Sequence, residues 1–135
     1  MLAPFPAYYP QEFSLLCRMP LELPDLNTYI NINRRNRFGG ATLKRNTDAL
    51  IRKYLPTMPA IEERVFLLFA WKRSNKRKDP DNVAFAKKFV LDALQKSGIL
   101  VGDSPKYVAG FADVFEYCDE NALEVWCLKT GEYID

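Results

Sequence analysis

The stretch RVFLLFAWK, residues 64–72, is a near-continuous apolar run in the middle of the chain. Its length is typical of a strand and far too short to cross a bilayer, so it predicts a buried strand. The basic stretch KRSNKRK, residues 72–78, follows directly and is expected to form an exposed loop. That loop leads into DPDN, residues 79–82, where two aspartates are separated by one proline. A buried strand that runs through a basic loop to paired carboxylates is therefore the centre of the predicted fold.

The clearest predicted helix follows DPDN and covers residues 81–97. Its apolar residues recur at helical spacing and form a stripe for packing, and Gly98 supplies a C-terminal stop. The stripe consists of Val83, Phe85, Ala86, Phe89, Val90, Ala93 and Leu94.

The N-terminal part of the chain predicts one strand and a helical region. Residues 12–23 have a mixed composition typical of a strand, and Pro20 places that strand at the edge of a sheet. A helix start follows near residue 25, and apolar residues then recur to residue 54. Gly39-Gly40 interrupts this pattern. The interruption predicts either two helices or one helix with a mobile basic insert.

Two more strands are predicted near the C-terminal end, at residues 107–117 and 123–129. A turn at residues 119–121 would join them as a hairpin. The whole order is then β-α-β-α-β-β. This order predicts a single α+β domain over residues 1–135, with one mixed sheet and helices packed on it.

Composition narrows the class of protein. The chain has 135 residues, 48% of them apolar and 27% charged, which is ordinary for a soluble globular domain. It has three cysteines and no histidine, which rules out the common zinc spacings, and the odd count argues against a disulfide framework. The opening MLAPFPAYYP lacks the basic and apolar regions of a secretory signal. We expect a cytoplasmic protein that makes no use of a membrane.

Positive charge is concentrated in the middle of the chain. Residues 34–78 carry thirteen Lys and Arg against three acids, a balance of +10, whereas residues 103–135 have a balance of −6. The basic half is therefore a candidate surface for nucleic acid. The alternative is that these charges are only solvated helix and loop faces. The candidate nucleic-acid contacts are Arg34, Arg35, Arg37, Lys44, Arg45, Lys72, Arg73, Lys76, Arg77, Lys78 and Lys87.

The paired aspartates of DPDN have two explanations. As a helix start, an acid followed by proline is a good cap, worth about 1 kcal/mol, and this accounts for one aspartate. Two like charges about 4 Å apart repel by about 1 kcal/mol in water, which a cap alone does not justify. A divalent cation would cancel that repulsion, since Mg²⁺ takes hard oxygen ligands from one or two carboxylates plus substrate phosphates. Such ions activate a water for phosphodiester hydrolysis.

Two further residue types fit this chemistry. Lys88 comes seven positions after Asp81, nearly in line with it on a straight helix, and could stabilise charge on a leaving oxygen. The alternative for both Lys88 and its neighbour Lys87 is that they simply belong to a solvated helix face. Asp103 lies in the turn GILVGDSP and is either a turn residue or a third carboxylate. The sequence contains no phosphate-binding loop, and without histidine no Ser-His-Asp triad is possible.

The segment DPDNVAFAKKFVLDALQKSGILVGDSPKYV, residues 79–108, resembles the core of the RusA-type Holliday junction endonucleases of bacteria and their prophages. The family pattern is a basic stretch, D-x-D-N, a lysine on the next helix, D-A-L, a glycine stop and an acid just beyond. A weaker likeness lies in LPDLNTYI, at Pro24 and Asn27. The matching residues are 76–78, Asp79, Asp81, Asn82, Lys87 or Lys88, Asp92-Ala93-Leu94, Gly98 and Asp103.

The resemblance implies a homodimeric, Mg²⁺-dependent enzyme, with Mn²⁺ as a substitute, that nicks four-way DNA junctions symmetrically. Its metal carboxylates would be Asp79, Asp81 and Asp103, and its catalytic lysine Lys88. The segment between DPDN and DAL is slightly longer here than the family pattern. Counting back from Asp92 therefore selects Lys88, whereas counting forward from Asp81 ends nearer Lys87. The last motif has Gly102 before Asp103, where two adjacent acids are expected.

Three hypotheses remain open at the level of sequence: a junction resolvase, a non-catalytic module that binds branched DNA, and a metal-dependent nuclease for flaps or other branched DNA. The position of Asp103 separates the first two, because a binding module has no use for a third acid there. A 17-residue helix is about 24 Å long, and six extended residues reach only about 20 Å. Asp103 therefore meets Asp79 only if residues 99–102 run back along the helix, or if a two-fold dimer shares its sites between subunits.

Overall fold

The apolar run at residues 64–72 forms strand β2 (Glu63–Arg73) in the computed structural model, which describes residues 12–134. The sheet has the strand order β1-β4-β2-β3, so β2 has a neighbour on each side. Successive side chains of a strand point to opposite faces, and Leu67, Leu68 and Phe69 are all fully buried. The prediction of a buried strand is confirmed.

The predicted α+β domain with one mixed sheet is also confirmed, and each of the two predicted helical regions is divided in two. The prediction for the opening residues 1–10 lies outside the described residues. In chain order the elements are β1 (Ser14–Met19), α2 (Leu26–Arg35), α3 (Gly39–Arg52), β2 (Glu63–Arg73), α4 (Pro80–Ala84), α5 (Lys87–Lys96), β3 (Val108–Tyr117) and β4 (Ala122–Tyr133).

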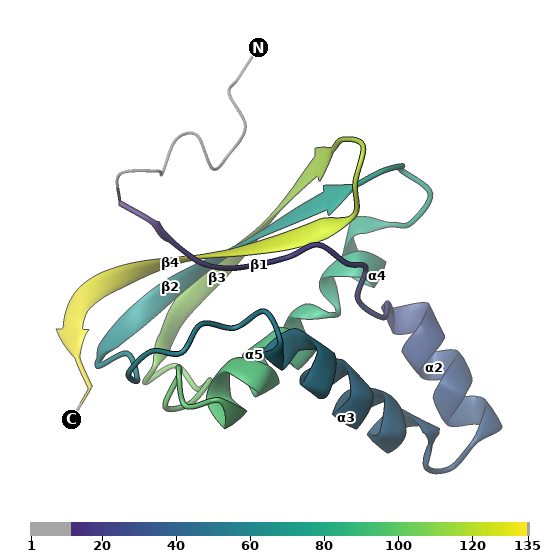
Figure 1. The fold of residues 1–135 in the computed structure, drawn as a ribbon, viewed down its shortest axis with the longest axis horizontal. Coiled ribbons are helices and arrows are strands. Elements are labelled where there is room, and N and C mark those ends of the chain that lie inside the picture. The colour runs from purple at the N-terminus through teal and green to yellow at the C-terminus, as the bar shows by residue number, and fades with distance from the viewer. Residues whose placement is uncertain (1–11, 135) are drawn as a thin grey trace.

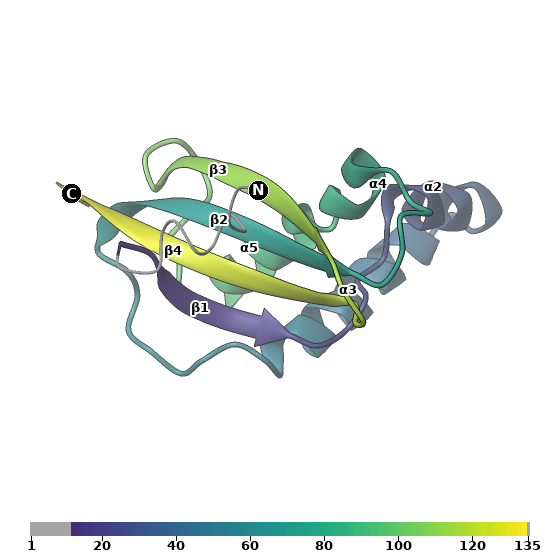
Figure 2. The same ribbon diagram turned by 90° about the horizontal axis from the view of Figure 1, so that it is seen from above.

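The predicted hairpin between the last two strands is wrong. β3 pairs with β2 in parallel and β4 pairs with β2 antiparallel, so β2 separates them, as Figure 2 shows from above. The connection crosses the end of β2, where the Cys118 N–H donates to the Arg73 carbonyl at 2.9 Å. The reason is that an apolar strand buried on both faces needs hydrogen-bond partners along both of its edges. The helices α4 and α5 form the crossover that a parallel β2–β3 pair requires.

The helices lie on one face of the sheet (Figure 1). β1 is an edge strand, as Pro20 predicted, and it ends at Met19. The core lies between the sheet and the helices α3 and α5. Its largest fully buried side chains include Phe69, Met19, Ile51, Leu67, Leu94, Ile99, Leu123, Val65, Val90 and Val125.

Helix α2 ends at Arg35, and the Gly39-Gly40 pair begins α3, which confirms the two-helix alternative. A Cβ atom at Gly40 would lie 2.1 Å from the Asn33 Oδ1, and one at Gly39 would lie 2.5 Å from the Ile32 Cγ2. Only glycine therefore allows the start of α3 to pack this closely on α2. The Asp25 carboxylate caps α2 by accepting the Thr28 N–H at 2.7 Å.

The helix predicted over residues 81–97 is broken at Phe85 and Ala86. Hydrogen bonds at the break reach only three residues back, from the Ala86 N–H to Val83 and from the Lys88 N–H to Phe85, so the chain winds more tightly there. The Phe85 ring packs 5.4 Å from the Tyr29 ring of α2, measured between centroids. The straight-helix argument that placed Lys88 above Asp81 therefore does not hold. The stop at Gly98 is confirmed, since this residue has a φ of +81° directly after α5.

Candidate functional site

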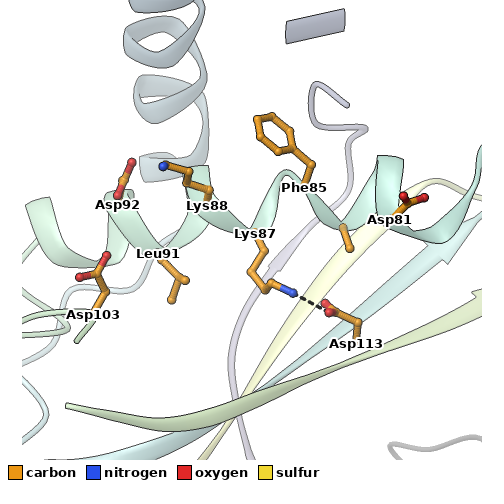
Figure 3. Close-up of a pocket in the computed structure, with 9 residues that line it drawn as sticks. Asp81, Phe85, Lys87, Lys88, Leu91, Asp92, Asp103 and Asp113 are labelled. Carbon is orange, nitrogen blue, oxygen red and sulfur yellow. Dashed lines mark hydrogen bonds and ion pairs between the residues drawn. The ribbon is translucent and has the colours of Figure 1, made fainter. Parts of the chain in front are cut away.

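A cavity of about 510 Å³ lies along α4 and α5 and reaches β3. Three of the four predicted catalytic residues, Asp81, Asp103 and Lys88, line this cavity, whereas Asp79 is not among the lining residues. We call this cavity the pocket. Its charged lining consists of four carboxylates and two ammonium groups, from Asp81, Asp92, Asp103, Asp113, Lys87 and Lys88 (Figure 3).

The DPDN segment begins α4, and its two aspartates are both exposed. Asp79 occupies the N-cap position of α4, but its side chain makes no capping hydrogen bond. Among residues 12–134, the Asp81 carboxylate accepts only the N–H of Asn82, at 2.9 Å. The Asn82 side chain in turn accepts the Asn27 N–H at 3.0 Å and joins the segment to the start of α2. Helix capping therefore does not account for the Asp79 side chain.

The best-connected carboxylate in the pocket is Asp113 on β3, which the sequence analysis missed. Its Oδ2 accepts from the Lys87 ammonium at 2.5 Å, and its Oδ1 accepts from the Trp71 indole N–H at 2.9 Å. A signal for Asp113 was present in the sequence. It stands at the centre of FADVF, residues 111–115, and replaces an apolar residue on the core-facing side of an alternating strand.

The two adjacent lysines point in opposite directions (Figure 3). Lys87 is half-buried and points at Asp113, and its ammonium also lies 4.1 Å from the centroid of the Phe111 ring. Lys88 is exposed, and its ammonium forms no ion pair with a carboxylate among residues 12–134. The assignment of Lys88 as the catalytic lysine stays a prediction, and the pocket offers as an alternative Lys87, which is held by Asp113.

Asp103 and Asp81 lie at opposite ends of the pocket (Figure 3). Residues 99–102 do turn back beside α5, since Asp103 lines the same cavity as Leu91 and Asp92. Gly102 is buried, and a Cβ atom there would lie 2.5 Å from the Tyr107 ring. A second acid next to Asp103 would therefore displace that ring, which explains why the motif has a single acid here.

The pocket suits a hard divalent cation in its chemistry but does not enclose one within a single chain. All its anionic groups are carboxylates, and Mg²⁺ binds through one or two carboxylates together with substrate phosphates and waters. Within residues 12–134, however, no three acid, cysteine or histidine side chains come close enough together to hold a metal ion. The predicted trio of Asp79, Asp81 and Asp103 is thus not brought together inside one chain.

Besides Lys87, which pairs with Asp113, three of the predicted DNA contacts are engaged in ion pairs. Arg73 is buried and contacts Glu22 at 2.9 Å, and Lys72 contacts Glu116 at 3.0 Å. Lys78 contacts both Glu22, at 2.9 Å, and the nearly buried Asp25, at 2.6 Å. Hydrogen bonds to Asp25 and then Glu22 raise the pKa of Lys78. Arg73 and Lys78 thus hold the loop before DPDN against the segment before α2, whereas Lys72 pairs with β3.

The other predicted DNA contacts lie mostly in the open. Lys76 lies 5.0 Å from the centroid of the exposed Tyr117 ring, and Arg37 lies 5.5 Å from that of Phe38, whose side chain is 67% exposed. Cations beside exposed aromatic rings suit the stacking and phosphate contacts of single-stranded nucleic acid. The exposed members of the predicted set are Arg34, Arg35, Arg37, Arg45, Lys76 and Arg77, while Lys44 is half-buried over Tyr29.

A membrane-spanning helix is not present in the described part of the chain, where no helix is both long and apolar enough. Comparison with protein-family models found no match to this chain, and comparison with curated proteins found none either. The features of the molecule that point to a function are the chemistry of the pocket and the motif of residues 79–108.

Proposed function

We propose that this chain is a Mg²⁺-dependent endonuclease that resolves four-way DNA junctions by paired phosphodiester hydrolysis. The observation that carries the proposal is the pocket itself. It gathers the carboxylates of Asp81, Asp103 and Asp113 with the ammonium groups of Lys87 and Lys88, and the exposed cations Lys76 and Arg77 come just before α4 in the chain. Carboxylates for a cation and cations for a phosphate are the parts that phosphodiester hydrolysis needs.

The carboxylates of Asp81 and Asp103, with Asp79 beside the former, are the groups that would hold Mg²⁺ or Mn²⁺. When bound, the ion would activate a water and neutralise charge on the phosphate oxygens. The carboxylates of Asp79 and Asp103 are free to do so, because neither forms a hydrogen bond or ion pair with another residue of the range 12–134. The lysines of the pocket would contact the phosphate on the other side.

A homodimer is part of the proposal, because two symmetric nicks require two sites. The separation of Asp81 from Asp103 within one chain supports a dimer in which each subunit supplies carboxylates to both sites. In a two-fold assembly the same surface serves both partners, so one contact would complete both sites together.

One observation favours a second candidate, a module that binds branched DNA without cutting it. This observation is the pair of cation–aromatic contacts on the surface, Lys76 beside the exposed Tyr117 ring and Arg37 beside the exposed Phe38 ring. Such a module would need only the exposed basic residues and would have no use for free acids at Asp79 and Asp103.

The test is cleavage of a plasmid that extrudes a cruciform, with a flap substrate and a plain duplex as comparisons. The wild type should linearise the cruciform plasmid in Mg²⁺, and not in EDTA, because a dimer nicks both strands within one encounter. Nicked circles without linear product would contradict the paired-site dimer, and preferred cutting of the flap would favour the third hypothesis.

Asp81→Asn should cut at less than about 1% of the wild-type rate and still bind the junction, since several kcal/mol of charge stabilisation depend on the cation. Asp119→Asn is the matched control, because Asp119 is an exposed aspartate outside the pocket, in the β3–β4 connection. Wild-type cutting by the Asp81 variant, or no cutting by any form with either metal, would overturn the proposal in favour of the binding module.

A further inference from the structure

Asp113 lies outside the segment 79–108 that carries the family resemblance, yet it is the most firmly held acid in the pocket. It faces the core side of β3, opposite Phe69 of β2 and between Phe111 and Phe115 along the strand. A carboxylate among aromatic rings is costly unless its oxygens are hydrogen-bonded. Its presence at this position therefore needs an explanation.

Both oxygens of Asp113 have a defined partner. Trp71, whose side chain is almost fully buried in the central strand, donates its indole N–H to the Oδ1 at 2.9 Å. The Oδ2 is left to accept from the Lys87 ammonium at 2.5 Å. Trp71 therefore fixes the orientation of the carboxylate, and the carboxylate fixes the place of the ammonium.

Lys87 keeps donors that the protein does not use. An ammonium group has three N–H donors, and Asp113 is the one acceptor that residues 12–134 offer to Lys87. Its side chain is 16% exposed, and the ammonium lies against the Phe111 ring inside the pocket. A half-buried cation with donors to spare, directed into a cavity, is suited to an anionic oxygen of a ligand.

We propose that Asp113 is a positioning residue: anchored by Trp71, it holds the Lys87 ammonium in the pocket, where the remaining donors contact a phosphate oxygen of the DNA. The inference rests on the proposed function and deepens it, because it selects Lys87 rather than Lys88 and adds two residues, Asp113 and Trp71, that the family motif does not contain. Asp113 itself need not touch the substrate.

A double-mutant cycle on the turnover of junction cleavage tests the coupling. Asp113→Asn keeps the shape of the side chain and an acceptor for Trp71 but removes the charge that holds Lys87. We expect kcat to fall by up to about 100-fold, the loss caused by a 1 Å misplacement of a catalytic group, with KM changed by less than about threefold. In the Lys87→Ala background the same change should cost almost nothing more.

A purely structural Asp113 predicts a different result. In that case the losses from Asp113→Asn and Lys87→Ala would multiply in the double variant, and this outcome would overturn the proposal. The matched comparison is Asp113→Asn combined with Lys88→Ala, where the losses should multiply because Lys88 does not contact Asp113. Should Asp113→Asn not fold, Trp71→Phe takes its place, since it keeps the buried ring and removes the N–H that orients the carboxylate.

A separate measurement keeps this inference distinct from the proposed function. If the wild type cuts no branched DNA, the proposed function is wrong, and nitrogen-15 NMR of the lysine ammonium groups decides the positioning. The Lys87 ammonium signal, identified by its absence in Lys87→Ala, should be visible in the wild type, shift on addition of inorganic phosphate, and be lost in Asp113→Asn. A Lys87 signal that Asp113→Asn leaves unchanged would overturn the inference.

Discussion

Two groups of charged residues flank the DPDN segment, and they differ in how many of their charges are paired with an opposite charge. One consists of Glu22, Asp25, Arg73 and Lys78, which we call the paired cluster. Every charge in the paired cluster contacts an opposite charge within 2.9 Å. In the pocket, by contrast, Asp103 has no partner among the described residues, and Lys87 uses one donor of three.

The electrostatics of the paired cluster are those of ion pairs that stabilise the folded state. Hydrogen bonds from Lys78 and then Arg73 hold the pKa of Glu22 below its usual range. Burial pushes the pKa of Asp25 upward, but hydrogen bonds from Lys78 and Thr28 outweigh it and leave that pKa lowered. Both carboxylates therefore stay ionised and bound to their cations at neutral pH. The difference shows that the basic stretch before DPDN contains two kinds of cation. Arg73 and Lys78 stabilise the fold through ion pairs, whereas their neighbours Lys76 and Arg77 are exposed and available to a ligand.

The largest effect expected from this difference is a loss of folding stability when Lys78 is removed. Lys78→Ala leaves the nearly buried Asp25 without its ammonium partner, and we expect a loss of about 1–3 kcal/mol in the free energy of unfolding at pH 7. Because the pKa values of Glu22 and Asp25 are lowered in the folded state, their stabilisation is complete above the usual range and is lost as the pH falls. The gap in Tm between wild type and variant should therefore shrink below about pH 4.

Thermal unfolding at pH 7 and pH 3 checks this prediction. Lys76→Ala is the control, since Lys76 is exposed and contacts no carboxylate in the described part of the chain. An equal loss of Tm in both variants, or a gap that does not depend on pH, would show that the paired cluster carries no special stability.

A smaller effect concerns DNA binding by the same basic loop. Lys76 and Arg77 are exposed, whereas Arg73 is buried against Glu22. Replacing Lys76 and Arg77 by Gln should make the log–log slope of junction affinity against salt shallower by about 0.9 per lost phosphate contact. Arg73→Gln should leave the slope unchanged and lower the Tm instead. A shallower slope in the Arg73 variant alone would reverse the assignment of these residues.

Much of the fold followed from local patterns. The buried β2, the edge position of β1 and the stop at Gly98 each depend on residue types within one segment. The hairpin prediction failed because a turn signal between β3 and β4 cannot reveal that β2 competes for both strands. The break at Phe85 likewise depends on a contact with Tyr29 of another helix.

The candidate site was predictable only in part, for a related reason. Asp81, Asp103 and Lys88 came from an ordered motif within some thirty residues of chain. The alternation of β3 marks Asp113 only as an acid at an apolar position. Its partners Trp71 and Lys87 lie 42 and 26 positions away, so the sequence pattern does not reveal what it contacts. The choice between the two lysines assumed a straight helix, and the break between α4 and α5 removes that assumption.

The most direct test of the division between pocket and paired cluster compares Asp103→Asn with Asp25→Asn. Both changes remove one negative charge, the first from an aspartate without a partner in the described range 12–134 and the second from one held by Lys78. For each variant the rate of junction cleavage per folded molecule and the Tm are measured together. We predict that Asp103→Asn keeps the wild-type Tm and loses at least about tenfold in rate, while Asp25→Asn loses Tm and cuts within about threefold of the wild type. Wild-type cleavage by Asp103→Asn, together with loss of cleavage in Asp25→Asn, would contradict the account.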